Sequence, residues 1–391
     1  MKCDLFLWQR TNNQEKPLLM RISTFFLQAD LQFNLFKPAL LCFVTAFIVA
    51  LLAIPPIIYL INRYQLHDVP NSRKLHRVPV PTMGGIAIIA GMVAALVLWF
   101  PFNNDIRQVC FFFSIIALFA MGIMDDLKDL SAKYKFIVQL GLASLIALSG
   151  IRITSFDGLF GIYELSTSTQ YTLTILAIVG ITNAFNLIDG IDGLCGGLSF
   201  MSLVTLGIFM TLSGDAGTAV IAFALAGAIL AFLYFNFNPA KIFMGDTGSL
   251  VIGFVVAVLC IRLLKFNIDS PTAVLPAAPM FVLGIVLVPV FDTIRVFAKR
   301  IWKGGSPFEA DKTHIHHLLT NQGFSHVFAV RVIYFVHAFI LIEVYLIQSL
   351  RQEMILLILV GLMIAVTIFF KKIGAYISYD KNESLQGSEG R

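Results

Sequence analysis

Long apolar runs alternate with short polar clusters along this chain. From residue 37 onward eleven hydrophobic runs follow one another, each close to the ~20 residues that a helix needs to cross a bilayer. Lipid offers the backbone no hydrogen-bond partners, so spanning segments are helices or strands of a closed barrel. These runs have helix length and do not alternate, which predicts helices. They cover about residues 37–61, 83–101, 108–124, 135–151, 171–188, 194–213, 217–235, 247–264, 274–298, 327–348 and 353–370.

The composition agrees with this pattern. The chain has 391 residues, of which 58% are hydrophobic and 13% are charged. Soluble domains carry roughly 25% charged residues, so this chain lacks the polar groups to cover its surface in water. We therefore expect an all-α, polytopic transmembrane bundle of about 11 helices.

The distribution of Lys and Arg predicts the orientation of the bundle. Sixteen of them lie in the loops after odd-numbered runs and in the C-terminal tail, whereas four lie in the loops after even-numbered runs. Positive loops stay in the cytoplasm, which places the C-terminus there and the N-terminus outside, against five basic residues in the N-terminal segment. We expect a polar extension over 1–36 without signal-peptide character, a transmembrane domain over 37–371 and a cytoplasmic tail over 372–391.

Several chemical classes lose support from the motifs. The five cysteines show no paired spacing, so neither a disulfide framework nor a zinc knuckle is indicated. No GxxxxGK[ST] sequence is present, so the chain gives no support for ATP hydrolysis by a P-loop.

The segment 183–193, Asn-Ala-Phe-Asn-Leu-Ile-Asp-Gly-Ile-Asp-Gly, interrupts two apolar runs with acids and carboxamides. Charged side chains near a bilayer are costly and usually functional. Asn186, Asp189 and Asp192 are spaced by three, so a helical turn here would place all three on one face.

A second acidic group ends the third run, where Asp125, Asp126 and Asp129 follow one another closely. A solvated helix end beside Lys128 is the simple interpretation. However, acids at a helix C-terminus oppose the macrodipole, and adjacent carboxylates repel unless a cation or a shared proton relieves them. A divalent metal or a role in proton transfer would explain them.

A third cluster, Phe243-Met-Gly-Asp246-Thr-Gly-Ser249, begins the eighth run. Asp246 has the residue type of an N-cap, which is the structural alternative. However, Asp246 occurs together with Asn186, Asp189 and Asp125. This set of acids and carboxamide favours a Mg²⁺ site, because Mg²⁺ takes hard oxygen ligands together with water and phosphate. Helix N-terminal amides also suit phosphate.

Histidines and basic residues form two further cytoplasmic clusters. His314, His316 and His317 lie in the longest predicted cytoplasmic loop, near Lys312. Zinc lacks a fourth ligand nearby in sequence, so phosphate donors fit better, and a plain solvated loop remains an alternative. Lys74 and Arg77 lie in a basic segment that a positive-inside flank also explains. Asp292 and Arg295, one turn apart, are expected to pair.

These clusters gather on one predicted face and supply the parts for phosphoryl transfer, in which positioning and charge neutralisation do most of the work. In this order they resemble the polyprenyl-phosphate N-acetylhexosamine-1-phosphate transferases over roughly residues 40–370. The motifs that carry the resemblance are Pro70-Asn-x-Arg-Lys-x-His76, Pro81-x-x-Gly-Gly85, Asp125-Asp126, Asn183–Gly193, Phe243–Ser249, and Ser306-Pro-Phe through His314-Ile-His-His317.

The resemblance implies an inner-membrane enzyme that converts undecaprenyl phosphate and UDP-GlcNAc into undecaprenyl-diphosphate-GlcNAc and UMP with Mg²⁺ or Mn²⁺. This is an initiating step of cell-surface glycan synthesis, of the O-antigen or enterobacterial common antigen type. The His-x-His-His run after Ser-Pro-Phe is closest to the branch that uses simple UDP-HexNAc. A related teichoic-acid-linkage enzyme carries a similar run, so the pathway and the sugar stay open.

The resemblance also implies roles for individual residues. It places metal ligands on Asn186 and Asp246, and a candidate base for the lipid phosphate on Asp125, with Asp126 beside it. It places the uridine and sugar-phosphate end near Asp189, Asp192 and Phe243, and the diphosphate near His314, His316 and His317. Lys74 and Arg77 are further candidates for substrate binding.

Two qualifications come from chemistry. A phosphate monoester has a second pKa near 6, so the lipid phosphate is largely dianionic at pH 7 and Asp125 is free to position it or relay a proton. The competing class is a transporter, whose ionisable groups lie near the midplane on two related halves. The acids here gather at helix ends and the halves show no repeat.

Overall fold

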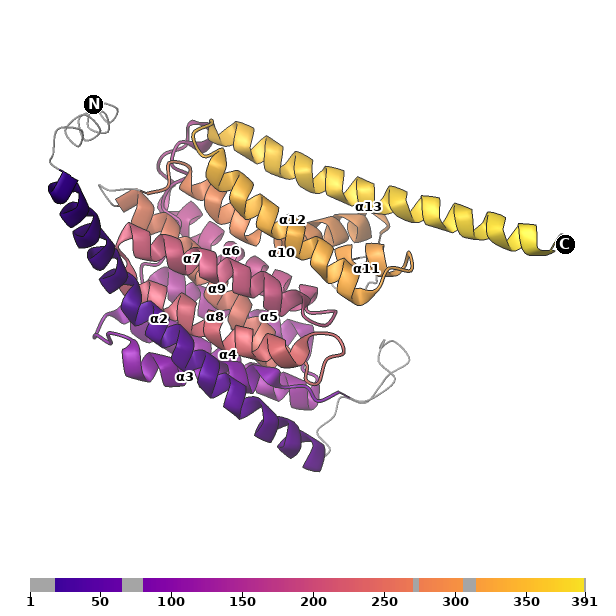
Figure 1. Cartoon of the computed structure of the whole chain (residues 1–391), viewed down its shortest axis with the longest axis horizontal. Coiled ribbons are helices and arrows are strands. Elements are labelled where there is room, and N and C mark those ends of the chain that lie inside the picture. The colour runs from indigo at the N-terminus through magenta and orange to yellow at the C-terminus, as the bar shows by residue number, and fades with distance from the viewer. Residues whose placement is uncertain (1–17, 65–79, 270–273, 305–313, 390–391) are drawn as a thin grey trace.

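The computed structural model describes residues 18–64, 80–269, 274–304 and 314–389, with side chains described between residues 36 and 372. Every regular element in these ranges is helical, which confirms the all-α prediction (Figure 1). Each of the eleven predicted runs coincides with one long helix. The elements are α2 (Leu18–Arg63), α3 (Gly84–Trp99), α4 (Ile106–Lys128), α5 (Ala132–Leu148), η1 (Leu159–Gly161), α6 (Thr167–Ile188), α7 (Leu194–Ser213), α8 (Ala216–Asn236), α9 (Asp246–Asp269), α10 (Ala278–Trp302), α11 (Ile315–Thr320), α12 (His326–Leu346) and α13 (Gln352–Glu389).

Within the described ranges, nine helices are long and apolar enough to cross a membrane. Two of the eleven long helices are shorter: α3 is apolar but has 16 residues, and α5 has 17. The chain is a multi-pass membrane protein. Which end of the bundle faces the cytoplasm stays a prediction.

Helix α9 forms the centre of the bundle. Of its most apolar 18-residue stretch, 94% is buried inside the protein, whereas for the corresponding stretch of α2 the share is 22%. Because α9 is apolar on all sides, it can be covered all round by protein, and it packs against α3, α4, α6, α7 and α10. Small residues permit this packing: a Cβ on Gly253 would lie 2.9 Å from the Cα of Thr182 in α6.

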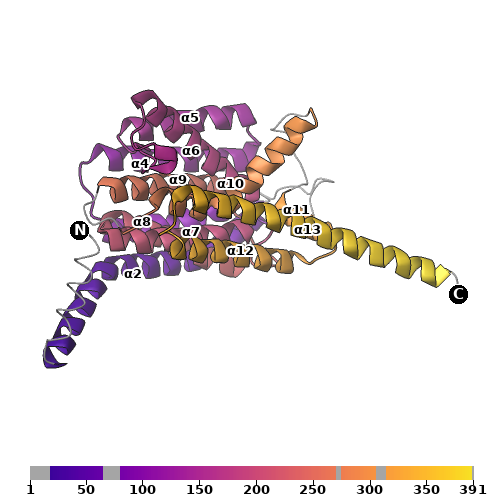
Figure 2. The same cartoon turned by 90° about the horizontal axis from the view of Figure 1, so that it is seen from above.

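Two helices continue beyond the predicted domain limits. The backbone of α2 is helical from Leu18, inside the segment predicted as a polar extension, and α13 continues to Glu389, through most of the predicted tail. Figures 1 and 2 show both helices projecting past the bundle. The loop predicted around the histidines is also partly helical, because residues 315–320 form α11.

Candidate active site

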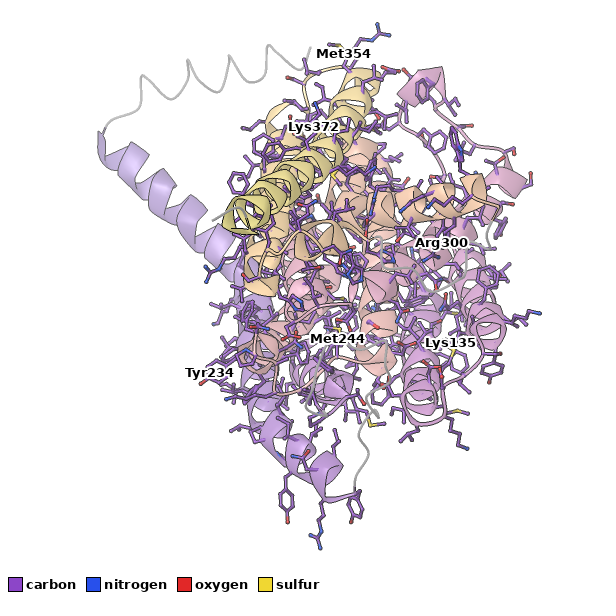
Figure 3. All side chains as sticks on the ribbon, turned by 90° about the vertical axis from the view of Figure 1, so that its right-hand side faces the viewer. Lys135, Tyr234, Met244, Arg300, Met354 and Lys372 are labelled. Carbon is purple, nitrogen blue, oxygen red and sulfur yellow. The ribbon has the colours of Figure 1, made fainter. Side chains whose placement is uncertain are left out.

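An acidic cluster forms where the last turn of α4 meets the first turn of α9. Ligand atoms of Asp125, Asp126 and Asp246 all lie within 4.8 Å of one another. Figure 3 looks onto this end of the bundle, with Lys135 of α5 and Met244 of the α8–α9 segment on the same face. The structure therefore brings Asp246 next to the adjacent pair Asp125 and Asp126, although Asp246 follows Asp126 by 120 residues in sequence.

Lys135 lies between two of these acids. Its Nζ is 2.9 Å from Asp125 Oδ2 and 2.9 Å from Asp246 Oδ2. The second oxygen of Asp125 accepts a 2.8 Å hydrogen bond from the backbone N–H of Leu130, so this carboxylate is held at both ends. One ammonium faces three carboxylates, which leaves two negative charges without a counter-charge among these four side chains.

Asp126 caps the N-terminus of α9 from a different helix. Its Oδ1 accepts from the backbone N–H of Asp246 at 2.8 Å, and its Oδ2 accepts from the N–H of Thr247 at 3.1 Å and from the Thr247 hydroxyl. The close approach requires a glycine on α4, because a Cβ on Gly122 would lie 2.5 Å from the Cα of Thr247. Asp126 thereby satisfies free amides of the first helical turn and sets the position of Asp246.

Asn186, near the end of α6, joins α6 to α9. Its Nδ2 lies 2.9 Å from Asp246 Oδ1 and 2.9 Å from Ser249 Oγ. A half-turn of the Asn186 amide about its Cβ–Cγ bond would present Oδ1 to the same place. The two residues that the resemblance gives as metal ligands, Asn186 and Asp246, are therefore in direct contact.

The chemistry of this donor set suits a divalent cation. Carboxylate and carboxamide oxygens are the hard ligands that Mg²⁺ and Mn²⁺ take, usually with one or two carboxylates supplied by protein. The Lys135 ammonium already occupies a cation position between Asp125 and Asp246. Asp125 and Asp246, with Asn186 bonded to Asp246, offer oxygen atoms close enough together that they could share a cation.

The prediction that Asn186, Asp189 and Asp192 share one face of a helix is wrong, because only Asn186 lies in a helix. Helix α6 ends at Ile188, and Asp189 is its C-cap with a non-helical ψ of 48°. Residues 189–193 form a turn that ends at Gly193, whose φ of 81° suits glycine, before α7 begins. Helix α6 therefore stops five residues before this glycine, and regular spacing in sequence does not reveal where a helix ends.

Asp189 lies near the acidic cluster. Burial is the main cause that raises the pKa of Asp189 to about 7, and repulsion from Asp246, Asp126 and Asp192 adds to it. A carboxyl group in this state is balanced between its neutral and charged forms at neutral pH. Asp189 is therefore within electrostatic range of Asp246 and Asp126.

Asp192 connects the turn to the segment that leads into α9. Its Oδ2 accepts from Asn238 Nδ2 at 3.0 Å and from the backbone N–H of Ala240 at 3.1 Å, and the residue is 4% exposed. The same turn is held by Asn236 Oδ1, which accepts from Gly193 N at 2.8 Å, and by the hydroxyl of Tyr334, which donates to Gly193 O.

His316 and His317 of α11, with His314 at its N-cap, are the histidines on the other side of this turn. His314 Nδ1 lies 2.9 Å from Asp292 Oδ2, and Asp292 Oδ1 accepts from the backbone N–H of Ile315 at 2.9 Å. Asp292 also pairs with Arg295 at 2.6 Å, which confirms the predicted pair and extends it. The contacts fix one ring nitrogen of His314 and the start of α11.

His316 packs directly against the turn. A Cβ on Gly190 would lie 2.9 Å from His316 Nε2, and the His316 ring stacks on that of His314 at 5.9 Å. His316 is 1% exposed, and neither ring nitrogen has a hydrogen-bond partner among the described residues. Burial, followed by the charge of His317, lowers the pKa of His316 to about 3, so its imidazole is neutral at pH 7.

The remaining candidates are placed less directly. The backbone of Phe243 bonds to Pro81 O and to Gly84 N, each at 2.8 Å, which joins the Pro81–Gly85 motif to the α8–α9 segment. The Phe243 side chain is partly exposed, and the His317 ring lies 4.2 Å from that of His316. Lys74 and Arg77 lie outside the described residues.

Two residues of the site escaped the sequence analysis. In the sequence Lys135 is one basic residue among many in the predicted cytoplasmic loops, and nothing there connects it with Asp246, 111 residues away. The spacing of Asp292 and Arg295 predicts only their pair, whereas the position of Asp292 inside an apolar run is the signal that marks it as functional.

Comparison with known proteins identifies the family of this chain. Residues 108–264 match the family described as glycosyl transferase family 4. The chain is 36% identical, over 75% of its length and 81% of the relative, to a probable undecaprenyl-phosphate N-acetylglucosaminyl 1-phosphate transferase from Bacillus subtilis. It is 34% identical to an undecaprenyl-phosphate alpha-N-acetylglucosaminyl 1-phosphate transferase from Haemophilus influenzae, over 71% of the chain and 78% of the relative. The corresponding protein of Yersinia pestis is 33% identical, over 66% and 71%.

Proposed function

The chain belongs to glycosyl transferase family 4, and on this premise we propose that it transfers GlcNAc-1-phosphate from UDP-GlcNAc to undecaprenyl phosphate, releasing UMP. The bond that forms joins an oxygen of the lipid phosphate to the phosphorus attached to the sugar. The bond that breaks is the diphosphate linkage to UMP, which leaves with the electron pair.

The observation that carries this proposal is the meeting of Asp125, Asp126 and Asp246 at one end of the bundle. Both substrates are phosphates, and two like-charged groups approach each other only where counter-charge is fixed in advance. The acids are able to supply that counter-charge by binding a cation, and Lys135 supplies one directly.

Asp246 and Asn186 are the proposed metal ligands, with Asp125 beside them. A bound Mg²⁺ or Mn²⁺ would neutralise charge on the diphosphate and orient it. Asp126 acts through α9, because its bonds to the first turn hold Asp246 in place.

Asp125 is the proposed partner of the lipid phosphate. The acceptor is largely dianionic at neutral pH, so the task of Asp125 is to position it, or to relay the proton of the minor monoanionic form, rather than to remove a reluctant proton. Lys135, bonded to the same carboxylate, provides a positive charge for an incoming phosphate.

The nucleotide-sugar end is assigned to the turn 189–193 and its neighbours. Asp189 contacts this end directly, Asp192 acts by holding the turn to residues 238–240, and Phe243 stacks on uracil. His314, His316 and His317, together with Lys74 and Arg77, bind the phosphates.

The site lies on the cytoplasmic face of the bacterial inner membrane in this proposal, as the loop charges predict. The product would begin a lipid-linked surface glycan, of the O-antigen or enterobacterial common antigen type. The same chemistry with another UDP-HexNAc, or for teichoic acid linkage, is the alternative to test.

The test is a transfer assay with purified full-length protein, Mg²⁺ and a panel of radiolabelled UDP-sugars. We expect label in the lipid fraction, and UMP release, only when undecaprenyl phosphate is present, with UDP-GlcNAc as the preferred donor. UMP release that does not depend on the lipid, or no transfer from any UDP-HexNAc, would refute the proposal.

A further inference from the structure

A cavity of about 210 Å³ lies at the end of the bundle opposite the acidic cluster. Arg262 of α9 lines it, and α9 rises about 1.5 Å per residue, so this residue lies about 24 Å from Asp246 along the helix axis. Arg107, in the first turn of α4, lines it as well, whereas Asp125 and Asp126 end the same helix. The cavity therefore belongs to the other membrane face.

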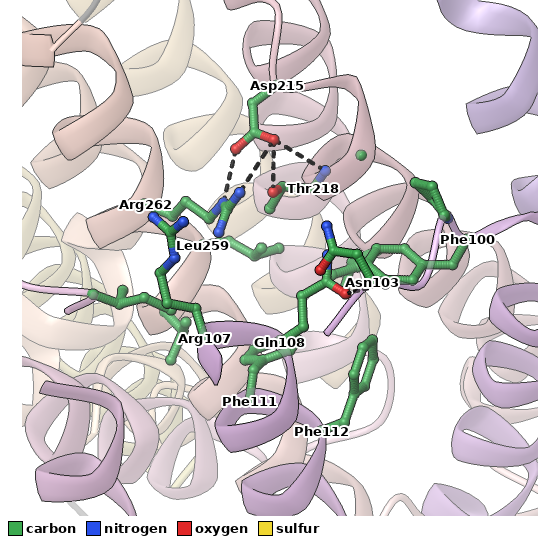
Figure 4. A pocket seen from close by; sticks show the side chains of 15 residues that line it. Phe100, Asn103, Arg107, Gln108, Phe111, Phe112, Asp215, Thr218, Leu259 and Arg262 are labelled. Atoms are coloured by element: carbon green, nitrogen blue, oxygen red, sulfur yellow. Dashed lines mark hydrogen bonds and ion pairs between the residues drawn. The ribbon is translucent and has the colours of Figure 1, made fainter. Parts of the chain in front are cut away.

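One wall of the cavity carries the charges. Arg262 Nε is 2.8 Å from Asp215 Oδ2, and the guanidinium of Arg107 is 2.8 Å from Asp105 Oδ2. The two ion pairs also act on each other, because Arg107 interacts electrostatically with Asp215 and Arg262 with Asp105. Figure 4 shows both guanidinium groups on one side of the cavity.

This wall has more donors than acceptors to offer a ligand. Asp215 Oδ1 already accepts from the Thr218 hydroxyl at 2.8 Å, and its Oδ2 accepts from Arg262. The side-chain oxygens of Asn103 and Gln108 accept from backbone amides at 3.0 Å and 3.1 Å, so their NH₂ groups are the ends available to a ligand. Since each guanidinium has five N–H groups, a ligand rich in acceptor oxygens, such as a phosphate, suits this wall.

The opposite wall is apolar. Phe100 and Phe112 pack edge to face with ring centroids 5.3 Å apart. Figure 4 shows these rings across the cavity from the two arginines. Ile106 and Val109, which flank the lining residues Arg107 and Gln108 on the membrane helix α4, are 61% and 56% exposed, so apolar surface of a membrane helix lies beside the cavity.

We propose that this cavity binds the phosphate head of a membrane phospholipid, with the start of its acyl chain against the phenylalanines. Phosphate oxygens meet Arg107 and Arg262, and the methylenes meet Phe100 and Phe112. A lipid bound there joins the ends of α4, α8 and α9, so it stabilises the folded bundle by mass action.

The experiment measures the melting temperature of the full-length protein, purified in a phosphate-free sugar detergent. The probes are dioctanoyl phosphatidylglycerol, dioctanoylglycerol without the phosphate, and inorganic phosphate. We expect a saturable rise of a few degrees with phosphatidylglycerol and none with the other two. A rise of the same size with dioctanoylglycerol or with inorganic phosphate would overturn the assignment.

Two variants test the two walls by different means. Arg107→Gln removes a half-exposed cation, and about tenfold more lipid should be needed for the half-maximal shift, the loss of about one charge-assisted hydrogen bond. Gly217→Leu fills the cavity without changing charge and should abolish the shift. A Cβ there meets only Pro101, at 3.7 Å, so the variant has room to fold.

Lys265→Gln is the matched control. Lys265 lies on the same end of α9 and pairs with Asp269 at 3.3 Å, but it does not line the cavity. Its lipid response should equal that of the parent protein. Equal responses from Arg107→Gln and Lys265→Gln would show that general surface charge, rather than this cavity, attracts the lipid.

Discussion

The carboxylate of Asp126 accepts a 2.8 Å hydrogen bond from the backbone N–H of Asp246. The two residues are neighbours in the acidic cluster, but this contact gives them different roles. Asp246 presents its side chain to Asn186 and Lys135, whereas both oxygens of Asp126 are directed at the first turn of α9. Asp126 is therefore a positioning residue for Asp246.

Replacing Asp126 with Ala should show this role. Loss of a helix cap costs ~1 kcal/mol, so a lower melting temperature is expected. In addition, Asp246 should lose its fixed position, and the Mg²⁺ concentration for half-maximal transfer should rise several-fold. The control is Ser166→Ala, which removes the N-cap of α6 at the end of that helix far from Asn186. It should lose stability without changing the Mg²⁺ dependence, and an unchanged Mg²⁺ dependence in Asp126→Ala would contradict the role.

The fold was largely predictable because the bilayer fixes both the length and the polarity of a spanning helix. Each predicted run coincides with a helix, and the bounds can agree within one residue, as for the run 217–235 and the helix Ala216–Asn236. Ends that leave the apolar region were not predictable in this way. Hydropathy does not show that α2 begins at Leu18 or that α13 continues to Glu389.

The candidate site was predictable as a set of acids but not as a set of contacts. Spacing grouped Asn186 with Asp189 and Asp192, whereas in the structure the helix ends at Ile188 and Asp192 turns to residues 238–240. The contact of Lys135 with Asp246 depends on how α4 and α6, which pack against both helices, place α5 beside the start of α9. No local pattern records a contact between helices that are distant in sequence.

Asp246→Asn should remove activity that depends on the divalent cation. The substitution keeps the shape but removes the charge that attracts a cation, so transfer at saturating substrates should fall by at least about a hundredfold. The measurement is the initial rate against Mg²⁺ and Mn²⁺ concentration. Asp269→Asn, at the other end of α9, is the matched control and should behave as the parent protein. Metal dependence that survives in Asp246→Asn would exclude this residue as a ligand.

Lys135→Gln tests the cation between Asp125 and Asp246. Without the ammonium, nearby acids should attract Mg²⁺ more strongly, so the half-saturating Mg²⁺ concentration should fall severalfold. The maximal rate should also fall, by about tenfold or more, because a fixed positive charge for the lipid phosphate is lost. Lys133→Gln changes an exposed charge on the same turn and should change neither quantity. If weaker Mg²⁺ binding accompanied the lower rate in Lys135→Gln, the electrostatic argument would be wrong.

Asp125→Asn separates turnover from donor binding. Asp125 bonds Lys135 and the backbone N–H of Leu130, and its proposed partner is the lipid phosphate rather than UDP-GlcNAc. We expect kcat to fall by about a hundredfold or more, while the KM for UDP-GlcNAc changes less than about threefold. Steady-state kinetics at fixed saturating undecaprenyl phosphate gives both values. A change confined to the KM for UDP-GlcNAc would move Asp125 to the donor side.

The pair of Asp292 and His314 is expected to act as a unit. Asp292 is 1% exposed and fixes Nδ1 of His314, so the ring presents its other nitrogen in a constant direction. Asp292→Asn should lower kcat/KM for UDP-GlcNAc by about tenfold, and His314→Ala should lower it at least as much. Since both changes remove the same oriented imidazole, the double variant should be little worse than His314→Ala alone, a coupling of ~1 kcal/mol or more. Asp292 also holds the start of α11 through the backbone N–H of Ile315, so thermal melts of all three variants are needed to separate lost stability from lost activity. Fully additive losses would mean that Asp292 serves the fold of α11 and leaves His314 to act independently.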